Sequence, residues 1–239
     1  MIRFITKNSL FYKRQEIWFY NGEKIPLYSN NLFYQAKSLP DNFIIQDKNN
    51  FYTSCIDLTL NEDTLFKNIK DRFRTEIRRA EREGCAFEYI EHLIHADFLK
   101  YMYLYEKFSK VKKLFPPDRY RMKALFESNN FMFTKVKYAG KEIVTHTYIM
   151  DNERVRLINS YHDIAFTDNK LRGYSNKYLH WMDILFFKSK GLSIYDFGGV
   201  NEEGYPGVAA FKKSFGGYEE QSFDFTVRKG IYKQFKHIY

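Results

Sequence analysis

The residues best suited to chemistry gather in one stretch near the C-terminus, Tyr195–Gly217 (YDFGGVNEEGYPGVAAFKKSFGG). An apolar run, Leu192–Phe197, ends there in a glycine pair, and glycine lets a backbone approach a ligand closely because it has no side chain. Asp196 lies two residues before the pair, at the end of a predicted strand, where α/β proteins place ligands. Lys212 follows in a short predicted helix and can hold a developing negative charge. The alternative interpretation of these residues is an ordinary strand and turn followed by a surface lysine without a catalytic role.

The composition indicates a soluble globular protein with an anionic partner. The chain has 239 residues, 44% of them hydrophobic and 28% charged, enough for one large domain or a domain with a small appendage. A net charge of +9 suits a nucleotide, CoA, nucleic acid or a membrane surface. The 24 Phe and 20 Tyr exceed the needs of a core, so some tyrosines are available to stack on a base or a sugar.

The cysteines and the hydropathy pattern point to the cytoplasm. Cys55 and Cys85 form neither a disulfide framework nor a metal-binding spacing, which favours a reducing compartment and no metal. No apolar run is long enough to span a membrane, and the N-terminus lacks the apolar core of a signal peptide.

The order of predicted elements indicates an α/β fold with a mixed, largely antiparallel sheet. Residues 1–51 form an N-terminal β extension, with a hairpin of strands 17–20 and 24–28 around Asn21–Gly22, and residues 52–239 form the main domain. The exposed aromatic strands of the extension are compatible with a homo-oligomer. The remaining expectations are strands at 51–60, 85–90, 131–139, 142–150, 154–161, 192–197 and 221–228, and helices at 61–84, 97–111, 118–127, 175–191 and 231–238.

Strand 154–161, the helix after it and strand 192–197 form a crossover unit, so the two strands are parallel. The loop that opens this helix holds Lys170, Arg172, Gly173, Tyr174, Ser175 and Asn176. Free backbone N–H groups and the positive end of the helix dipole meet Arg172 there, an arrangement that suits a pyrophosphate. An ordinary N-cap at Ser175 is the alternative.

Three stretches, in order along the chain, carry a family resemblance. RFRTEIRRAEREG at 72–84 resembles a basic helix of the Fem-type acyltransferases, the peptidoglycan bridge-forming group within the GNAT superfamily. YLHWMDILFFKSKG at 178–191 resembles the helix before their DFGG strand, and DFGG followed by FKKSFGG resembles their C-terminal signature. The resemblance implies a GNAT-like fold with a splayed parallel strand pair, acyl-CoA held at the crossover helix, and Lys212 beside Phe211 stabilising the oxyanion.

Acyl transfer to an amine also needs a proton acceptor. Asp196 and His146 are the first candidates and His162 a weaker one, although a strand histidine more often has a structural role. Tyr161, Tyr174 and Tyr195 are candidates for contact with the acceptor. Acceptor phosphates could be bound by the helix arginines Arg72, Arg74 and Arg78, but pairs such as Arg72–Glu76 favour a solvated, salt-bridged surface for most of these charges.

The substrates follow from the size of the chain. Peptidoglycan bridge enzymes usually have two such domains and take aminoacyl-tRNA, whereas this chain has room for one domain and its extension. Short relatives resemble acyl-CoA-dependent N-acyltransferases that act on nucleotide-linked amino sugars for O-antigen, capsule or related glycans, here a dTDP- or UDP-sugar. The alternatives are an aminoacyl-tRNA-dependent transferase and a basic nucleic-acid-binding protein without catalysis. Against the latter, acidic residues interleave with the basic ones.

Overall fold

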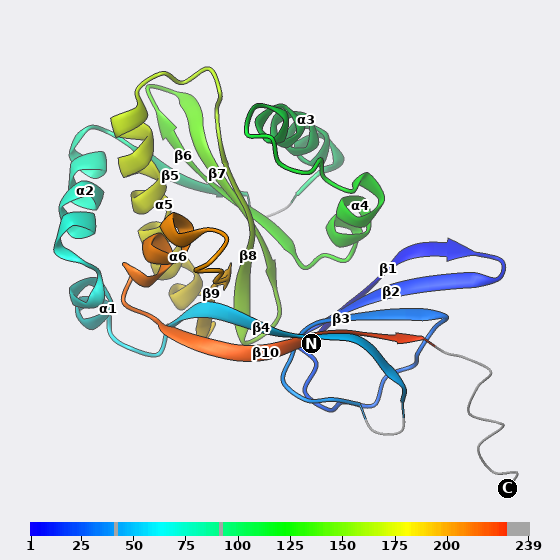
Figure 1. Ribbon diagram of the computed structural model, residues 1–239. Helices are drawn as coiled ribbons and strands as arrows, with labels where there is room; N and C mark the ends of the chain where they lie inside the picture. Colours follow the sequence, from blue (N-terminus) through cyan, green and yellow to red (C-terminus); the bar gives the residue numbers. More distant parts are fainter. Residues whose placement is uncertain (41–42, 91–92, 229–239) are drawn as a thin grey trace, which may run out of the picture. The chain divides into compact units, whose positions relative to one another are not determined.

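The computed structural model describes residues 1–40, 43–90 and 93–228 (Figure 1). Ten strands hydrogen-bond in the order β1-β2-β3-β10-β4-β9-β8-β7-β6-β5, so the sheet is mixed, as expected. The strands are β1 (Ile2–Ser9), β2 (Tyr12–Trp18), β3 (Asn30–Ala36), β4 (Ile45–Asp57), β5 (Ala86–Ile90), β6 (Phe131–Tyr138), β7 (Lys141–Met150), β8 (Arg154–His162), β9 (Ile194–Gly199) and β10 (Tyr218–Arg228). The helices are α1 (Glu62–Asn68), α2 (Asp71–Arg82), α3 (His95–Val111), α4 (Arg119–Glu127), α5 (Asn169–Ser189) and α6 (Pro206–Lys213).

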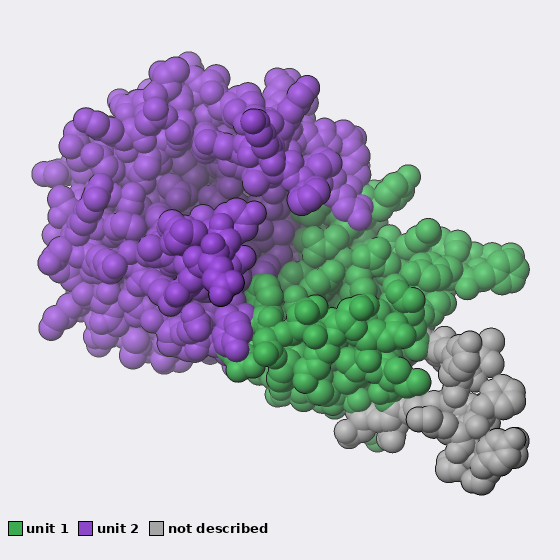
Figure 2. All heavy atoms as spheres, viewed as in Figure 1, with its two compact units in different colours: residues 1–51, 120–129, 221–239 green, residues 52–119, 130–220 purple. Residues whose placement is uncertain are grey.

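The chain divides into two compact units, coloured separately in Figure 2. Unit 1 holds residues 1–51, 120–129 and 221–239, and unit 2 holds residues 52–119 and 130–220. In unit 1, Ile17, Phe33 and Phe225 form the centre of a small apolar core. The boundary between an extension at 1–51 and a domain at 52–239 stays a prediction.

Unit 1 differs from the expected hairpin. The antiparallel partner of β2 is β1, and β2 pairs with β3 in parallel, while residues 24–28 form no strand. Side chains satisfy the backbone of that segment instead, because Gln15 Nε2 donates to the Pro26 carbonyl at 2.9 Å and Asn31 Oδ1 accepts from the Tyr28 N–H at 2.8 Å. A strand in this segment is therefore not needed to satisfy these groups.

In unit 2, helices cover both faces of the antiparallel strands. His146 and Tyr148 of β7 face α5, which contacts β6 and β7, while α3 packs against β8 on the opposite face (Figure 1). The main core lies between the sheet and α5, and includes Val155, Leu179 and Phe187. No helix among residues 1–40, 43–90 and 93–228 is long and apolar enough to cross a membrane.

The single helix expected at 61–84 is two helices. Asn61 caps α1 as predicted, with its Oδ1 accepting from the Thr64 N–H at 2.8 Å. Ile69 then turns extended, and the Lys70 N–H donates to the Ser214 carbonyl at 2.9 Å. A distant segment of chain thus takes the hydrogen bond that would have continued the helix. The helix expected at 231–238 lies outside the described residues.

The two glycines of Phe215–Gly217 pack against the chain close to the break between α1 and α2. A Cβ on Gly216 would lie 2.2 Å from the Asn68 carbonyl oxygen, and one on Gly217 would lie 2.0 Å from that of Cys55. Real Cβ atoms do not come so close to backbone oxygens, so these positions require glycine. The segment after Lys212 is therefore fixed against α1 and β4 by backbone contact.

We expect Gly217→Ala to lower the free energy of unfolding by about 1–3 kcal/mol, because the added methyl forces the backbone apart. Gly207→Ala is the matched control, since nothing lies within 4 Å of a Cβ there and alanine favours the helix. Urea unfolding of both variants provides the measurement. Equal stability of the two proteins would contradict the close contact.

Candidate active site

The parallel strands β8 and β9 separate along their length. They pair at three positions only, Arg154 with Ile194, Val155 with Tyr195 and Arg156 with Asp196. Beyond them β8 runs on to His162 and β9 to Gly199, and there no described residue of one strand pairs with the other. The β7–β8 register also shifts next to Tyr148, which bends β8 at this level. The expected splayed pair is therefore present.

Asp196 sits at the last paired position and is fully buried. One carboxylate oxygen accepts from the Thr53 hydroxyl and from the Gly198 N–H at 2.6 Å, and the other accepts from Arg154 Nη1 at 2.9 Å. Arg154 is itself buried and also pairs with Glu220. With both oxygens engaged, Asp196 fixes the turn into Gly198 and has no oxygen directed at a substrate. Its role as the base stays a prediction that this geometry disfavours.

Lys212 lies in the last turn of α6, beside the end of β9. Its ammonium donates to the Gly199 carbonyl at 2.6 Å. Burial, together with the nearby Arg156 guanidinium, lowers the Lys212 pKa to about 8. The side chain thus remains mostly protonated at neutral pH. A half-buried ammonium next to the separating strands can stabilise an oxyanion more strongly than one in water.

A chain of buried polar groups connects β7, α5 and β9. Tyr148 donates to Asp183 Oδ2 at 2.5 Å, the Tyr148 and Tyr195 hydroxyls are 2.8 Å apart, and Tyr195 is 2.8 Å from His180 Nδ1. Tyr148 donates its only hydroxyl proton to Asp183, so Tyr195 must be the donor in the hydrogen bond between the two tyrosines. His180 must then donate through Nδ1. This leaves the lone pair of His180 on Nε2, which makes no hydrogen bond with any described residue.

His146 lies at the other end of this network and is fully buried. Its Nδ1 is 2.7 Å from Asp183 Oδ2, and its Nε2 is 3.0 Å from Asn176 Oδ1. Both ring nitrogens are therefore engaged, unlike those of His180. Burial, His146 and Lys212 together hold the His180 pKa well below its usual value, so His180 is neutral at pH 7.

Three of these residues have side chains of types that bind metals. His146, His180 and Asp183 each place one ligand atom within 4.8 Å of the others. His146 and Asp183 already hydrogen-bond each other, and His180 bonds Tyr195. Nothing in this arrangement requires an ion, and the expectation of no metal stays a prediction.

The helix after β8 starts earlier than expected. Asp168, not Ser175, caps α5, and its Oδ1 accepts from the Lys170 and Leu171 N–H groups at 3.0 and 2.9 Å. Residues 170–176 therefore form the first two helical turns. Ser175 is buried, with its hydroxyl donating to the Leu171 carbonyl and contacting Cys85, so it faces the core.

A hollow of about 250 Å³ lies beside these turns and the end of β8. Arg172, Gly173 and Asn176 line it, together with Tyr161 and His162. Burial and the Arg172 and Lys112 charges lower the His162 pKa to about 4, so this histidine is neutral at pH 7. Tyr174 lies apart from this lining and stacks under Arg79. Of the predicted pyrophosphate contacts, Arg172, Gly173 and Asn176 meet at this hollow, whereas Tyr174 and Ser175 do not. The role of the hollow in binding pyrophosphate stays a prediction.

The other predicted contacts are dispersed. Tyr195 is fully buried in the network, and Phe211 packs between Phe73 and Phe215. The predicted phosphate-binding arginines of α2 contact neighbouring side chains, as the charge pattern of the sequence predicted for most of them. Arg72 pairs with Glu76, Arg74 with Asp71, and Arg78 lies over the Phe66 ring.

His180 and Asp183 were not among the residues predicted from the sequence. Together with Asn176 they recur at four- and three-residue steps, so they share one face of α5. A polar stripe on the face of a helix that also buries Leu179 and Phe187 was the available signal. Arg154 and Arg156 were missed as well, because alternate polar residues in a strand usually face solvent.

The sequence matches no protein-family model and no curated protein. Solved structures do match. FemX is 14% identical with a TM-score of 0.59, over 78% of this chain and 63% of FemX. L-PGS from Bacillus licheniformis is 12% identical with a TM-score of 0.54, over 84% of this chain and 68% of its own. The C-terminal domain of a protein described as a lysylphosphatidylglycerol synthetase, from Agrobacterium fabrum, is 13% identical with a TM-score of 0.57. This match covers 84% of the present chain and 68% of the Agrobacterium chain.

The chain shares the fold of FemX, of L-PGS and of the Agrobacterium domain. At these identities the likeness concerns the fold, and the chain spans less than two thirds of FemX. In this fold β8 and β9 are the separating pair, and α5 is the crossover helix between them.

We expect Asp196→Asn to lower the free energy of unfolding by about 3 kcal/mol, because it leaves the buried Arg154 charge without its full compensation. Asp71→Asn removes an exposed partner of Arg74 and should cost less than about 1 kcal/mol. Chemical denaturation compares the two variants. A stable Asp196→Asn protein whose activity recovers at high pH would instead identify Asp196 as the base.

Proposed function

We propose that the protein is an N-acyltransferase that moves an acyl group from acyl-CoA to the amine of a nucleotide-linked amino sugar. The observation that carries the proposal is the separation of β8 and β9 after three residue pairs, with the Lys212 ammonium beside the end of β9. Unpaired backbone groups of the separating strands can hydrogen-bond an extended acyl donor. The Arg172 guanidinium in the hollow would pair with the pyrophosphate of that donor.

The reaction places separate demands on the residues. The amine nitrogen attacks the thioester carbonyl carbon, the carbonyl oxygen becomes an oxyanion, and the carbon–sulfur bond then breaks to release the CoA thiolate, which takes a proton from water. Lys212 would stabilise the oxyanion. The amine loses a proton, and His180 is the group we assign as its acceptor, because its Nε2 carries the free lone pair. Tyr195 and Tyr148 connect it to Asp183, which stabilises the imidazolium that forms.

A second candidate is an aminoacyl-tRNA-dependent transferase. The fold match to FemX favours it, since the Fem-type resemblance implies a charged tRNA as donor. The +9 charge fits either donor, because CoA and tRNA are both anionic.

The donor is tested by calorimetric titration and by product analysis. We expect heat on titration with acetyl-CoA, and an N-acylated product with a dTDP- or UDP-amino sugar. Arg172→Ala should weaken CoA binding by about tenfold, since one charge-assisted contact is worth about 1.5–3 kcal/mol. Lys170→Ala at the start of the same helix is the control. Activity that requires charged tRNA and disappears after RNase treatment would replace this proposal by the second candidate.

Lys212 and His180 are expected to respond differently to substitution. Lys212→Met should lower kcat by about 100-fold with little change in KM, because the charge it stabilises exists only in the transition state. His180→Gln should lower kcat at neutral pH but regain rate at higher pH, where more of the amine is already neutral. Lys213→Met is the control, since Lys213 is exposed and paired with Glu202. Equal losses in kcat and in acceptor affinity for Lys212→Met would contradict its role.

The Lys212 variant also carries a stability signature. A lysine pKa of about 8 in the folded state lies below the ordinary 10.5. Between pH 8 and pH 10.5 the unfolded chain therefore binds more protons than the folded protein. The free energy of unfolding of the parent protein rises with pH over this range. Lys212→Met removes this dependence, so its stability relative to the parent is highest below pH 8 and declines above it. A Lys212→Met protein that loses activity but keeps its stability at pH 7 would show that Lys212 acts in catalysis and not in folding.

A further inference from the structure

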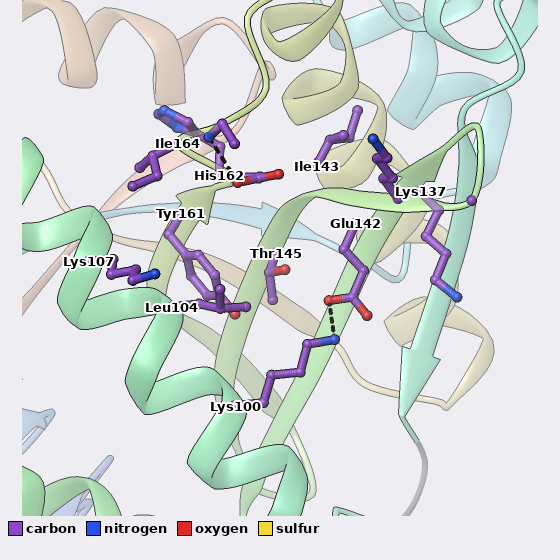
Figure 3. A pocket seen from close by; sticks show the side chains of 14 residues that line it. Lys100, Leu104, Lys107, Lys137, Glu142, Ile143, Thr145, Tyr161, His162 and Ile164 are labelled. Carbon is purple, nitrogen blue, oxygen red and sulfur yellow. Dashed lines mark hydrogen bonds and ion pairs between the residues drawn. The ribbon is translucent and has the colours of Figure 1, made fainter.

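A second, larger cavity lies on the opposite face of the sheet, between α3, the β6–β7 hairpin and the end of β8 (Figure 3). Its volume is about 560 Å³, within the range of small-molecule sites. Four lysines line it, which we call the lysine pocket: Lys100, Lys107, Lys137 and Lys141. Figure 3 shows Lys107 on α3 facing the side of the cavity opposite Lys137.

Four lysines outnumber the two carboxylates, Glu142 and Asp163, that line the lysine pocket, and Lys137 pairs with Glu88 at 2.9 Å. Glu142 pairs with Lys100 at 2.8 Å and with Lys135 at 2.6 Å, and Asp163 Oδ1 accepts from the Ala165 N–H at 2.9 Å. Lys107 and Lys141 have no carboxylate partner among residues 1–40, 43–90 and 93–228. The cavity therefore presents an excess of positive charge.

The neighbouring His162 is placed to respond to an anion bound in the lysine pocket. Its imidazole lines the lysine pocket as well as the hollow at Arg172. Its pKa of about 4 follows from burial and from the charges of Arg172 and Lys112. An anion in the pocket would reduce this repulsion, and cations alone would increase it.

Apolar and aromatic side chains form another part of the lining. Leu104, Ile143 and Tyr161 form much of the wall between the lysines. An anionic ligand that fits must therefore also carry an apolar or aromatic body, as a nucleoside diphosphate does. A free inorganic anion would leave these side chains without a partner.

We propose that the lysine pocket binds the nucleoside diphosphate of the acceptor. This inference rests on the proposed acyl transfer and assigns the acceptor to a different place from the α2 arginines, which are engaged with their own neighbours. The hollow at Arg172 and the lysine pocket share Tyr161 and His162, so donor and acceptor would meet along the end of β8. The organic diphosphate could also come from CoA, and the experiment separates the two sources.

The test titrates UDP, dTDP, CoA and inorganic pyrophosphate into the full chain by calorimetry. We expect UDP or dTDP to bind more tightly than pyrophosphate and to shift the His162 imidazole NMR signals. The double variant Lys107→Gln/Lys141→Gln should weaken nucleotide binding by about tenfold or more and leave CoA binding within about twofold. Lys110→Gln/Lys113→Gln makes the same change of charge outside the pocket and should leave nucleotide binding within about twofold.

The outcomes separate this inference from the proposed function. Equal loss of nucleotide affinity in both double variants, tighter binding of pyrophosphate than of nucleotides, or absence of nucleotide binding would overturn the pocket assignment. A loss confined to CoA would move the donor into the lysine pocket and also overturn it. Selective nucleotide binding in a protein that transfers no acyl group would leave the pocket intact and reject the proposed function. Acyl transfer with unaltered acceptor KM in the Lys107/Lys141 variant would reject the pocket alone.

Discussion

The ion pair between Arg154 and Asp196 holds the geometry on which the rest of unit 2 depends. It joins the first residue of β8 to β9 at the point where the two strands cease to pair. The Thr53 hydroxyl and the Gly198 N–H donate further hydrogen bonds to the Asp196 carboxylate, and Glu220 is a second partner of the Arg154 guanidinium. Buried charges are costly unless compensated, so this network tolerates few alternative arrangements. The strands can separate beyond it because their ends are fixed here.

Polar groups are buried between α5 and the sheet, next to the level at which β8 and β9 separate. Tyr148, Tyr195 and His180 form a hydrogen-bonded chain that ends at Asp183, and each satisfies its neighbour. Such a network fixes side-chain orientations, because a changed rotamer leaves a buried group without a partner. The orientation of His180 is thus a consequence of the fold.

Two cationic hollows lie next to each other at the end of β8. One is beside the first turns of α5, and the other is under α3 on the opposite face. Tyr161 and His162 belong to both, because alternate residues of a strand point to opposite faces and the last ones reach the edge. Both hollows therefore place cationic side chains where the sheet opens.

The sequence by itself determined the strands of the meander, the crossover unit and the stretch that contains Lys212. Hydrophobic periodicity and turn residues are local signals, and 131–161 and 178–199 carry them clearly. The cap of α5 at Asp168 is a local contact with the Lys170 and Leu171 N–H groups, so the sequence carried this signal although the predicted cap was Ser175. Tertiary structure alone decided the break at Ile69, where Ser214 from a distant segment takes a backbone hydrogen bond. It also decided that Asp196 pairs with Arg154 and that His180 joins a buried network. These depend on contacts between residues far apart in the chain, and no local pattern of letters encodes such partners.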